Sequence, residues 1–322
     1  MTPTQAPLTV VVLAGGISHE RDVSLRSGRR VADGLRHRGA TVVLRDPDAT
    51  LLPYLDEVRP DVVWPALHGA SGEDGALFAL LEHAGIPYVG SPSDAARLAW
   101  HKPTAKTLVA REGVRTPESI TLPKDTFREL GASSVLTSVL RSLDLPVVVK
   151  PAQGGSAQGV SFVDDPADLP SAMVDAYTYG DVALIERRVT GREISIGVIE
   201  TTDGPAALPA TEIVPLSGVY DFAARYNAGE TRFFTPARLD ADVASAAAAA
   251  AITVHETLGL RHISRVDFIV DDEGTPWFLE VNVLPGLTET SLVPQGIEAS
   301  EHDLGEIYRA LAELAIQDAL AR

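Results

Sequence analysis

The chain contains no cysteine, which excludes disulfides, thiolate catalysis and zinc–thiolate sites. Cations are scarce as well: 27 lysines and arginines face 44 aspartates and glutamates, which leaves a net charge of −17. This balance argues against a sequence-independent grip on nucleic acid or on an anionic membrane. No run reaches the roughly 18 apolar residues of a membrane span, and no basic stretch precedes an apolar core at the N-terminus. We therefore expect a cytoplasmic protein without nucleic-acid or membrane partners.

Two common nucleotide-binding motifs are also missing. Gly15 and Gly16 do not continue into Gly-x-Gly-x-x-Gly, which makes a hydride-transfer dehydrogenase a poor hypothesis. The Gly-x-x-x-x-Gly-Lys-Ser/Thr spacing of a P-loop is absent too. A nucleotide, if one binds, must be held by a different arrangement.

The 322 residues, 45% of them hydrophobic, are long for one core and suggest two or three domains. The first part alternates strand-like and helical segments, as in a small α/β domain whose first strand is buried and parallel. Its expected strands are 8–14, 42–44, 61–64 and 87–89, with a helix at 24–35. A helical stretch at 94–112 leads to a second unit with strands near 119–122, 145–150, 160–163 and 183–186. The third unit has a strand at 193–199, an alanine-rich helix near 244–251 and a closing helix at about 303–320. These patterns predict a mixed α/β fold with units at 1–97, 98–190 and 191–322.

Two strand-like runs near the C-terminus, 265–270 and 277–282, should pair as an antiparallel hairpin. The turn between them contains Gly274, which can take a positive φ. Such a hairpin places Asp267 opposite Glu280 or within about one residue of it.

Side chains alternate along a strand, so Glu280 and Asn282 share one face of this hairpin, as do Arg265 and Asp267. Hard oxygen ligands suit magnesium, which usually bridges to substrate phosphates. The hairpin is therefore either a magnesium site beside a nucleotide triphosphate or a polar strand face with solvated carboxylates.

A glycine-rich loop at 154–159 follows a strand-like run that ends in Lys150. Glycines let backbone N–H groups approach phosphate oxygens closely, and the lysine adds a point charge. The loop alone would more often be structural, but Lys150 and the acidic hairpin favour phosphate binding. Further on, Glu186 and Glu193 border an irregular stretch that could form hydrogen bonds with an adenine amino group and with ribose hydroxyls. Taken singly, such glutamates are more often ordinary surface residues.

These features occur in the order found in ATP-grasp carboxylate–amine ligases, and the chain resembles the D-alanine:D-alanine ligase family in particular. Residues 15–24 and 67–75 resemble that family's first two signatures, and 280–292 resembles its C-terminal signature. Residues 220–226 fall where the family has its mobile loop. The likeness covers about residues 8–318. It implies an ATP-grasp fold, in which a Rossmann-like N-terminal subdomain adjoins two α+β subdomains that clamp ATP.

By this resemblance, the carboxylate of a first D-alanine attacks the γ-phosphate of ATP, and the amine of a second D-alanine attacks the resulting acylphosphate. Positioning and charge neutralisation are what such a phosphoryl transfer needs. The implied cofactors are ATP and two Mg²⁺ ions, with Mn²⁺ as an alternative. The implied metal ligands are Asp267, Glu280 and Asn282, and the implied nucleotide-binding residues are Lys102, Lys150, Gly155, Ser156, Glu186, Arg187, Val189, Glu193 and Arg225.

The resemblance also assigns the amino-acid sites. Glu20 would take the ammonium group of the first D-alanine, and His68 would lie in the substrate site. Arg265 and the Gly286 N–H would stabilise the tetrahedral oxyanion. The second carboxylate would bind Ser291, the Leu292 N–H and Arg265. A hydrogen-bonded set would latch the mobile loop and exclude water from the acylphosphate; its members are Glu20, Ser156 and Tyr226.

Several of these residues have simpler roles available. Glu20 could cap the helix that begins near residue 21, because acids favour helix N-termini. His68 could be a hydrogen-bonded loop histidine, and Tyr226 an exposed loop aromatic. Lys106 lies on the same predicted helical face as Lys102 and competes for its role.

The chain departs from the family pattern at a few positions. Trp100-His101-Lys102 replaces the usual Met-Asp-Lys and precedes Pro103, which leaves the local helix register less secure. Ala157 removes a possible phosphate donor, Val283 replaces a threonine, and Arg225 replaces a lysine with a cation of different shape. His68-Gly-Ala-Ser71 also replaces the frequent His-Gly-Arg-Gly.

Three functions follow from the residues and the resemblance. The first is D-alanyl-D-alanine synthesis for peptidoglycan precursors, and the family resemblance implies a homodimer. The second is a paralogue that joins other amino acids, in a natural-product or resistance role. The third is a nucleotide-binding homologue without catalysis, against which the intact Arg265 and metal set argue. Tyr226 favours an amine nucleophile, since ligases that form D-alanyl-D-lactate tend to have histidine there.

Overall fold

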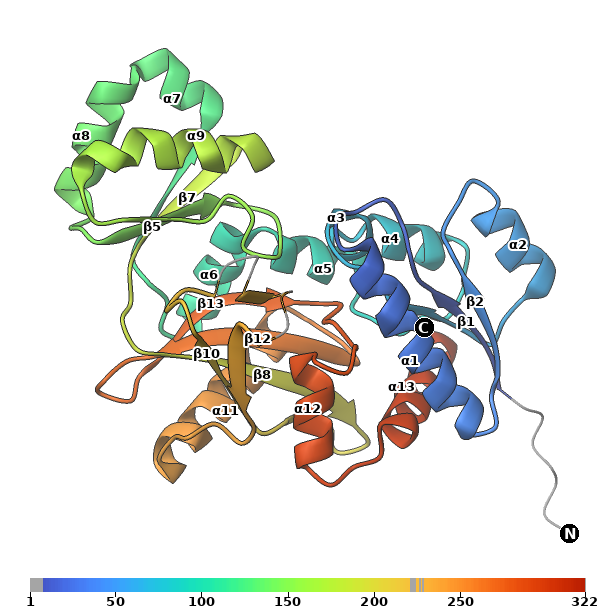
Figure 1. Ribbon diagram of the computed structural model, residues 1–322. Helices are drawn as coiled ribbons and strands as arrows, with labels where there is room; N and C mark the ends of the chain where they lie inside the picture. Colours follow the sequence, from blue (N-terminus) through green and yellow to red (C-terminus); the bar gives the residue numbers. More distant parts are fainter. Residues whose placement is uncertain (1–7, 221–223, 226, 228, 322) are drawn as a thin grey trace, which may run out of the picture.

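The computed structural model describes residues 8–220, 224–225, 227 and 229–321, which fold around three sheets (Figure 1). The first sheet contains β1 (Thr9–Leu13), β2 (Thr41–Arg45) and β3 (Val62–Pro65) in the order β2-β1-β3, and all its pairs are parallel. β1 lies in the centre, and its valines and leucine are buried, as expected of a parallel strand covered on both faces. The predicted parallel strand is confirmed, but residues 87–89 contribute an isolated bridge to β3 instead of a strand.

The longest helix of this part, α1 (Arg21–His37), packs against the last helix that the structure describes. The helices are α1 (Arg21–His37), α2 (Leu51–Val58), α3 (Ala70–Glu73), α4 (Ala76–His83) and α5 (Ser93–Trp100). α1 packs against α13 (Leu304–Leu320), the last helix, and the two lie side by side in Figure 1. Gly34 permits the close approach, because a Cβ there would stand 3.1 Å from Cδ2 of Tyr308. The final helix therefore completes the core of the first sheet.

The expected helical stretch at 94–112 is two helices and not one. α5 ends at Trp100, and α6 (Lys102–Arg111) begins after His101, whose φ of −92° and ψ of 92° are extended. Pro103 explains the break: it has no N–H to bond to the carbonyl four residues earlier in a continuing helix, so it stands in the first turn of α6, where that N–H is not needed. The break places Lys102 at the start of a helix.

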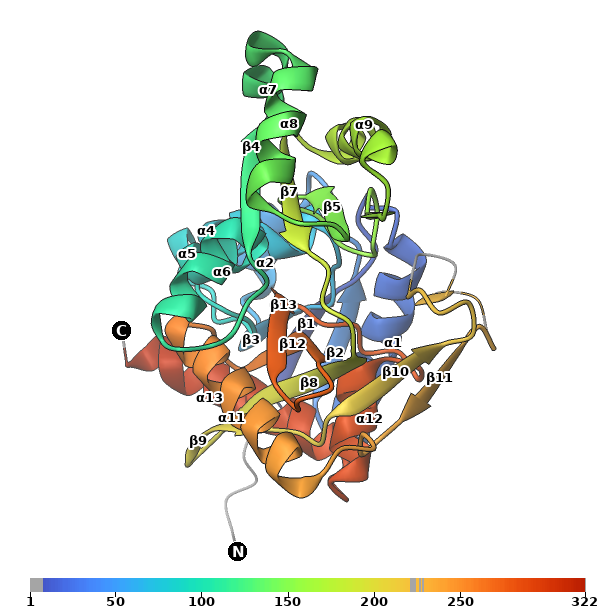
Figure 2. The same ribbon diagram turned by 90° about the vertical axis from the view of Figure 1, so that its left-hand side faces the viewer.

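The second sheet is antiparallel and has the order β4-β7-β5-β6. Its strands are β4 (Ser119–Pro123), β5 (Val147–Pro151), β6 (Ser161–Val163) and β7 (Val182–Arg187), which confirms the four predicted strands. Three helices and a short 3-10 turn accompany it: α7 (Lys124–Leu130), α8 (Ala132–Ser142), η1 (Pro166–Asp168) and α9 (Leu169–Tyr179). α8 and α9 share an apolar core with this sheet. Figure 2 shows this lobe standing away from the other two sheets.

The third sheet has the path β11-β10-β8-β12-β13, and β9 pairs with β8. Its strands are β8 (Arg192–Thr201), β9 (Gly204–Ala207), β10 (Thr211–Pro215), β11 (Thr231–Phe234), β12 (Ile263–Val270) and β13 (Pro276–Asn282). α11 (Ala241–Thr257) covers the face that carries Ile194, Ile196 and Val198. Because strand side chains alternate, Glu193 and Ser195 face the opposite side, toward the second lobe. α12 (Leu292–Ala299) packs against β8 and β10.

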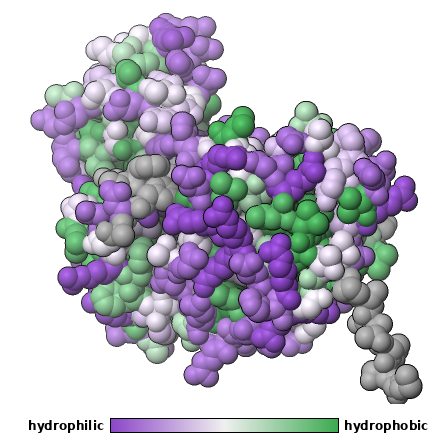
Figure 3. All heavy atoms as spheres, turned by 45° about the vertical axis from the view of Figure 1, so that its right-hand side comes forward, coloured by the Kyte–Doolittle hydropathy of each residue, from purple (hydrophilic) through white to green (hydrophobic). Residues whose placement is uncertain are grey.

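The surface agrees with the composition. The face drawn in Figure 3 is covered mainly by hydrophilic side chains. Among the residues that the structure describes, no helix combines the length and the apolar character needed to cross a bilayer.

Candidate active site

The acidic hairpin has the predicted geometry. β12 and β13 are antiparallel, with Asp267 directly opposite Glu280 and Arg265 directly opposite Asn282. Gly274 in the turn has a φ of 81°, as predicted. Opposed residues of an antiparallel pair share a face, so the four polar side chains project from one surface.

Cations surround the two carboxylates of this hairpin. Arg265 donates from Nε and Nη2 to the two oxygens of Asp267 at 2.9 and 2.8 Å, and Ser195 Oγ donates to Asp267 at 2.7 Å. Lys102 Nζ lies 3.1 Å from Glu280. Burial alone would raise the pKa of Glu280, but Lys102, Arg225, Lys150 and Arg265 outweigh it and lower the pKa to about 2. Paired, anionic oxygen donors are a set that fits Mg²⁺.

A cavity of about 740 Å³ lies between the second and third sheets. It brings together most of the predicted nucleotide and metal residues: Lys102, Lys150, Gly155, Glu186, Arg187, Val189, Glu193, Arg225, Asp267 and Glu280. The sequence analysis did not identify the apolar part of its wall, which includes Val148, Phe162, Ile213 and Leu279. A pocket with apolar walls and a few charged groups at one end is typical of a small-molecule site.

Glu186 lies between two lysines at the base of this cavity. Its carboxylate forms an ion pair with Lys150 and another with Lys106, whose Nζ is 2.6 Å away. Burial raises the pKa of Glu186, but the two lysines reverse the effect and the net pKa is lowered. Lys102 instead bonds to the carbonyl of Gly154 at 2.6 Å and faces Glu280 of the acidic hairpin. Lys102 and Lys150 therefore line the cavity, whereas Lys106 lies behind its lining and pairs with Glu186.

The glycine-rich loop contacts the N-terminal unit. Ser156 donates a hydrogen bond to Glu20 Oε1, which brings together two members of the predicted latch. Tyr226, the third member, lies outside the described residues. Ser156 and Ala157 both have a φ of 54°, a strained conformation for residues with a Cβ and one that occurs often at ligand-binding loops. Glu20 stands at the N-cap position of α1, as the simpler interpretation expects, but its side chain makes no capping hydrogen bond there and accepts one from Ser156.

The second signature is buried beside Glu20. His68 Nδ1 lies 3.1 Å from the carbonyl oxygen of Leu284, and its Nε2 lies 3.1 Å from Ser27 Oγ. Burial lowers the pKa of His68, which keeps the ring neutral. Glu73 accepts a hydrogen bond from the Gly69 N–H at 2.9 Å, and burial, followed by the charge of Glu20, raises its pKa to about 8.

The loop between β13 and α12 carries the predicted acceptor residues. Ser291 precedes the first residue of α12, so the Leu292 N–H belongs to the unpaired donors at a helix start, which suit a carboxylate. Ser291 Oγ accepts a hydrogen bond from the Thr288 N–H at 3.0 Å. A Cβ at Gly286 would stand 2.8 Å from Ser291 Oγ, which explains glycine at this position.

A cavity between two antiparallel sheets, with lysines and paired carboxylates at one end, agrees with the ATP-grasp fold that the family resemblance implies, in which two subdomains clamp ATP. Comparison with known proteins agrees. The family model "D-ala D-ala ligase C-terminus" matches residues 108–313, and "D-ala D-ala ligase N-terminus" matches 52–91. The chain belongs to the D-alanine–D-alanine ligase family.

Individual relatives span almost the whole chain. The D-alanine–D-alanine ligase of Anaeromyxobacter sp. strain Fw109-5 is 44% identical over 89% of this chain and 90% of the relative. That of Pelotomaculum thermopropionicum is 37% identical over 97% and 98%, respectively. Among solved structures, the VanG D-Ala:D-Ser ligase of Enterococcus faecalis has a TM-score of 0.83 at 25% identity and covers 96% of this chain and 99% of its own. The Bacillus anthracis D-alanine–D-alanine ligase complexed with ATP has a TM-score of 0.79 at 26% identity, with 98% and 99% covered. The predicted ATP-grasp fold is confirmed.

Proposed function

We propose that this protein uses ATP to join two D-alanines into D-alanyl-D-alanine, with release of ADP and phosphate, for peptidoglycan precursor synthesis. The observation that carries the proposal is the position of the acidic hairpin. It faces the cavity on one side, and its second strand ends at Asn282, four residues before Gly286 in the loop that also contains Ser291. Nucleotide and amino acid can therefore meet at one place.

ATP would occupy the 740 Å³ cavity with its triphosphate toward the hairpin. Lys102, Lys150 and Arg225 would neutralise the phosphates, together with the N–H groups of Gly155 and Ser156. The base and ribose would lie against the segment that holds Glu186, Arg187, Val189 and Glu193 and against the apolar wall. Two Mg²⁺ ions, or Mn²⁺ in their place, would be held by Asp267, Glu280 and Asn282 and would offset the negative charge of the phosphates.

The chemistry then follows from charge. Glu20 would hold the ammonium group of the first D-alanine, while a carboxylate oxygen attacks the γ-phosphorus and the bond to the β-phosphate oxygen breaks. The amine of the second D-alanine would attack the acyl carbon, and phosphate would leave with its oxygen. Arg265 and the Gly286 N–H would stabilise the oxyanion between these steps. Ser291, the Leu292 N–H and Arg265 would hold the second carboxylate.

The Glu20–Ser156 contact supports a closed arrangement around the donor site. Together with Tyr226 it would latch the mobile loop over the acylphosphate and keep water away from it. His68 would line the donor side of the same space. We also propose a homodimer in the cytoplasm, and functional units at 1–97, 98–190 and 191–322, each of which contains one of the three sheets.

An amino-acid panel tests the proposed function. Purified protein with ATP and Mg²⁺ is given single D- and L-amino acids, pairs of them, and D-lactate, while ADP and ligated product are both measured. We expect ADP and dipeptide in equal amounts with D-alanine alone. D-Serine is the informative second acceptor, because the VanG structure named as a D-Ala:D-Ser ligase is similar to this chain. Rapid turnover without D-alanine would contradict the substrate assignment, and no ADP under any condition would contradict catalysis.

A further inference from the structure

Three side chains from the first 97 residues hold the backbone of the loop that contains Gly286. They attach on both sides of this glycine, and each attaches to a different peptide group. His68 Nδ1 meets the Leu284 oxygen at 3.1 Å, Ser27 Oγ meets the Leu287 nitrogen at 3.0 Å, and Arg30 Nη1 meets the Thr288 oxygen at 2.7 Å. We call these three side chains, His68, Ser27 and Arg30, the α1 clasp. The proposed oxyanion donor thus lies between fixed points that belong to another part of the chain.

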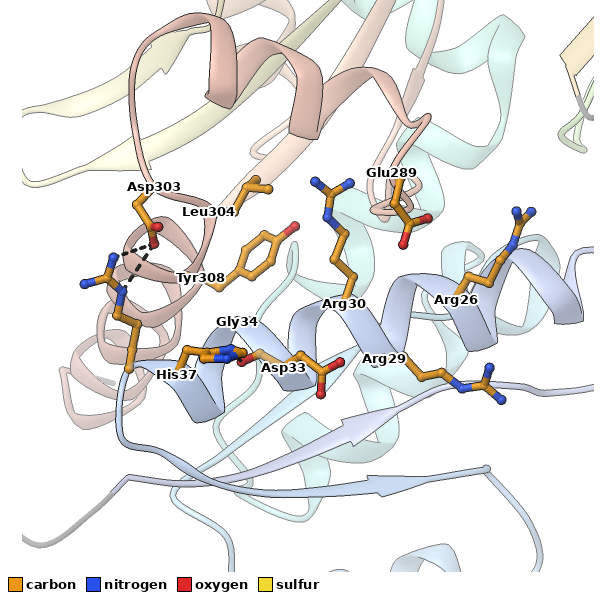
Figure 4. Close-up of a pocket in the computed structure, with 12 residues that line it drawn as sticks. Arg26, Arg29, Arg30, Asp33, Gly34, His37, Glu289, Asp303, Leu304 and Tyr308 are labelled. Carbon is orange, nitrogen blue, oxygen red and sulfur yellow. Dashed lines mark hydrogen bonds and ion pairs between the residues drawn. The ribbon is translucent and has the colours of Figure 1, made fainter. Parts of the chain in front are cut away.

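Two members of the clasp are one helical turn apart. Ser27 and Arg30 stand at positions i and i+3 of α1, so they project from the same face of the helix. Ser27 is fully buried, whereas Arg30 lies at the border of the groove between α1 and α13, where Figure 4 shows it extending from α1 toward the loop of Glu289. α1 thereby contacts the loop at a buried point and at a half-exposed one.

The hydrogen-bond directions in the clasp are fixed by chemistry. The Leu284 carbonyl can only accept, so His68 Nδ1 carries the proton and donates to it. His68 Nε2 is then an acceptor and receives the hydroxyl proton of Ser27. This arrangement leaves a lone pair of Ser27 Oγ for the Leu287 N–H. Each polar group in this buried chain has a partner, and removal of the Ser27 hydroxyl leaves two of them without one.

Arg30 connects the loop to the acceptor side. Its Nη1 bonds to the Thr288 carbonyl, and its Nη2 bonds to Glu298 on α12 at 2.6 Å. Thr288 in turn bonds to Ser291 through both its N–H and its hydroxyl. One guanidinium therefore holds both the loop and the helix whose first N–H groups face the acceptor carboxylate.

We propose that the α1 clasp positions the reacting centre: Ser27, through His68 and Leu287, sets the direction of the Gly286 N–H, and Arg30 sets the acceptor pocket. This inference rests on the proposed function for the roles of Gly286 and Ser291. Ser27 and Arg30 touch no substrate in this scheme and act through the loop backbone. The clasp makes the geometry of the C-terminal site depend on a helix of the N-terminal unit.

The Arg30 part of the inference is tested by Arg30→Ala with two controls. Arg26 lies one turn earlier on α1, is exposed, and makes no hydrogen bond or ion pair within the described part of the chain, so Arg26→Ala removes the same charge without the contact. Glu298→Ala removes the ion pair but leaves the Thr288 bond. We expect Arg30→Ala to raise the KM of the second D-alanine on the order of tenfold, as for the loss of one charge-assisted hydrogen bond. The KM of ATP should stay within about twofold, and Arg26→Ala should resemble the wild type. Glu298→Ala, which frees α12 from Arg30 but keeps the Thr288 bond, should raise the KM of the second D-alanine less than Arg30→Ala does.

The Ser27 part is tested by Ser27→Ala against Ser91→Ala. Ser91 is also fully buried, and its hydroxyl also accepts a backbone N–H from the C-terminal part, that of Arg261 at 3.2 Å, but far along the chain from Gly286. We expect kcat to fall roughly 10- to 100-fold in Ser27→Ala, because a displaced oxyanion donor loses its value in the transition state, with little change in KM. Ser91→Ala should keep its kcat.

Amide hydrogen exchange separates this inference from the proposed function. Exchange of residues 284–292 should accelerate in Ser27→Ala and Arg30→Ala, but not in Ser91→Ala or Arg26→Ala, whatever the substrate is. Unchanged exchange in both clasp variants would overturn the inference even if the wild type makes dipeptide. Equal kinetic losses in the clasp variants and their controls would overturn it as well. A wild type that makes no dipeptide, with accelerated exchange in the clasp variants, would refute the proposed function and leave the clasp as a feature of the loop.

Discussion

The buried carboxylate of Glu186 permits a quantitative test of the site's electrostatics. The Glu186 side chain is 3% exposed and forms ion pairs with two lysines. The side chain of Lys106 is 4% exposed and that of Lys150 is 10% exposed. The Glu186→Gln variant keeps the shape of the side chain and removes its charge. Both lysines then lose the carboxylate that neutralises them.

The expected cost follows from the different surroundings of the two lysines. Lys150 borders the cavity and can turn toward water, whereas Lys106 is enclosed between α6 and β7. The buried ammonium group of Lys106 therefore has no compensating charge in the variant, which lowers the unfolding free energy by about 3–5 kcal/mol. The matched control is Glu212→Gln: Glu212 is also buried, but its bidentate partner Arg238 is 56% exposed and stays hydrated. We expect the control to lose about 1 kcal/mol.

Urea denaturation at pH 7 and pH 9.5 measures both variants against the wild type. Burial already lowers the pKa of Lys106, and loss of Glu186 lowers it further. The unfolded variant then binds more protons than the folded variant, so the stability of the variant rises with pH as Lys106 loses its proton. The deficit relative to the wild type should shrink at pH 9.5. Equal losses in the two variants at pH 7, or a deficit that does not change with pH, would refute this reasoning.

Three further predictions concern the loop, the oxyanion donor and a buried acid. Tyr226→Phe should raise ATP hydrolysis relative to dipeptide formation, measured as the ratio of ADP to product; an equal loss of both would contradict a latch. Gly286→Ala should lower kcat/KM at least about tenfold with an unchanged melting temperature, because its Cβ would press on Ser291 Oγ. Glu73 has a pKa raised to about 8 by burial and by Glu20, so its protonated form stabilises the fold below the unfolded pKa of 4.5, and this stability is lost as pH rises through 8. The urea midpoint of Glu73→Gln, which keeps an acceptor for the Gly69 N–H, should therefore fall less between pH 5 and pH 8 than that of the wild type.

The local sequence could predict those parts of the site whose geometry depends on residues close together in the chain. The pairing of Asp267 with Glu280 follows from a turn with Gly274 and from the period of two along a strand. The strands and the long helices were predictable from apolar periodicity for the same reason. The order of the family motifs also predicted which residues from distant segments line one cavity, although the sequence alone gave no distance between these residues.

The parts that could not be predicted depend on packing between distant segments. The role of Lys106 is one example, because its ion pair with Glu186 requires α6 to lie against β7, 80 positions along the chain. The apolar cavity wall is another, since Val148 and Phe162 look like ordinary strand residues. β9, β10 and β11 were missed because they are short and carry mixed residues. The break at His101 was signalled by Pro103 but outweighed by the helical pattern on both sides.

The packing of α13 on α1 has a consequence for biosynthesis. The apolar face of α1, with Val31 and Leu35, shares one core cluster with Tyr308 and Leu311 of the last helix. A ribosome makes the first sheet before the third, yet α13, which covers the first sheet, is translated after both. Until then, the nascent chain must expose this apolar face or leave it to a chaperone. The first sheet is therefore synthesised before the third but completed after it, and loss of α13 should destabilise the first sheet more than the third sheet, which precedes α13 in the sequence.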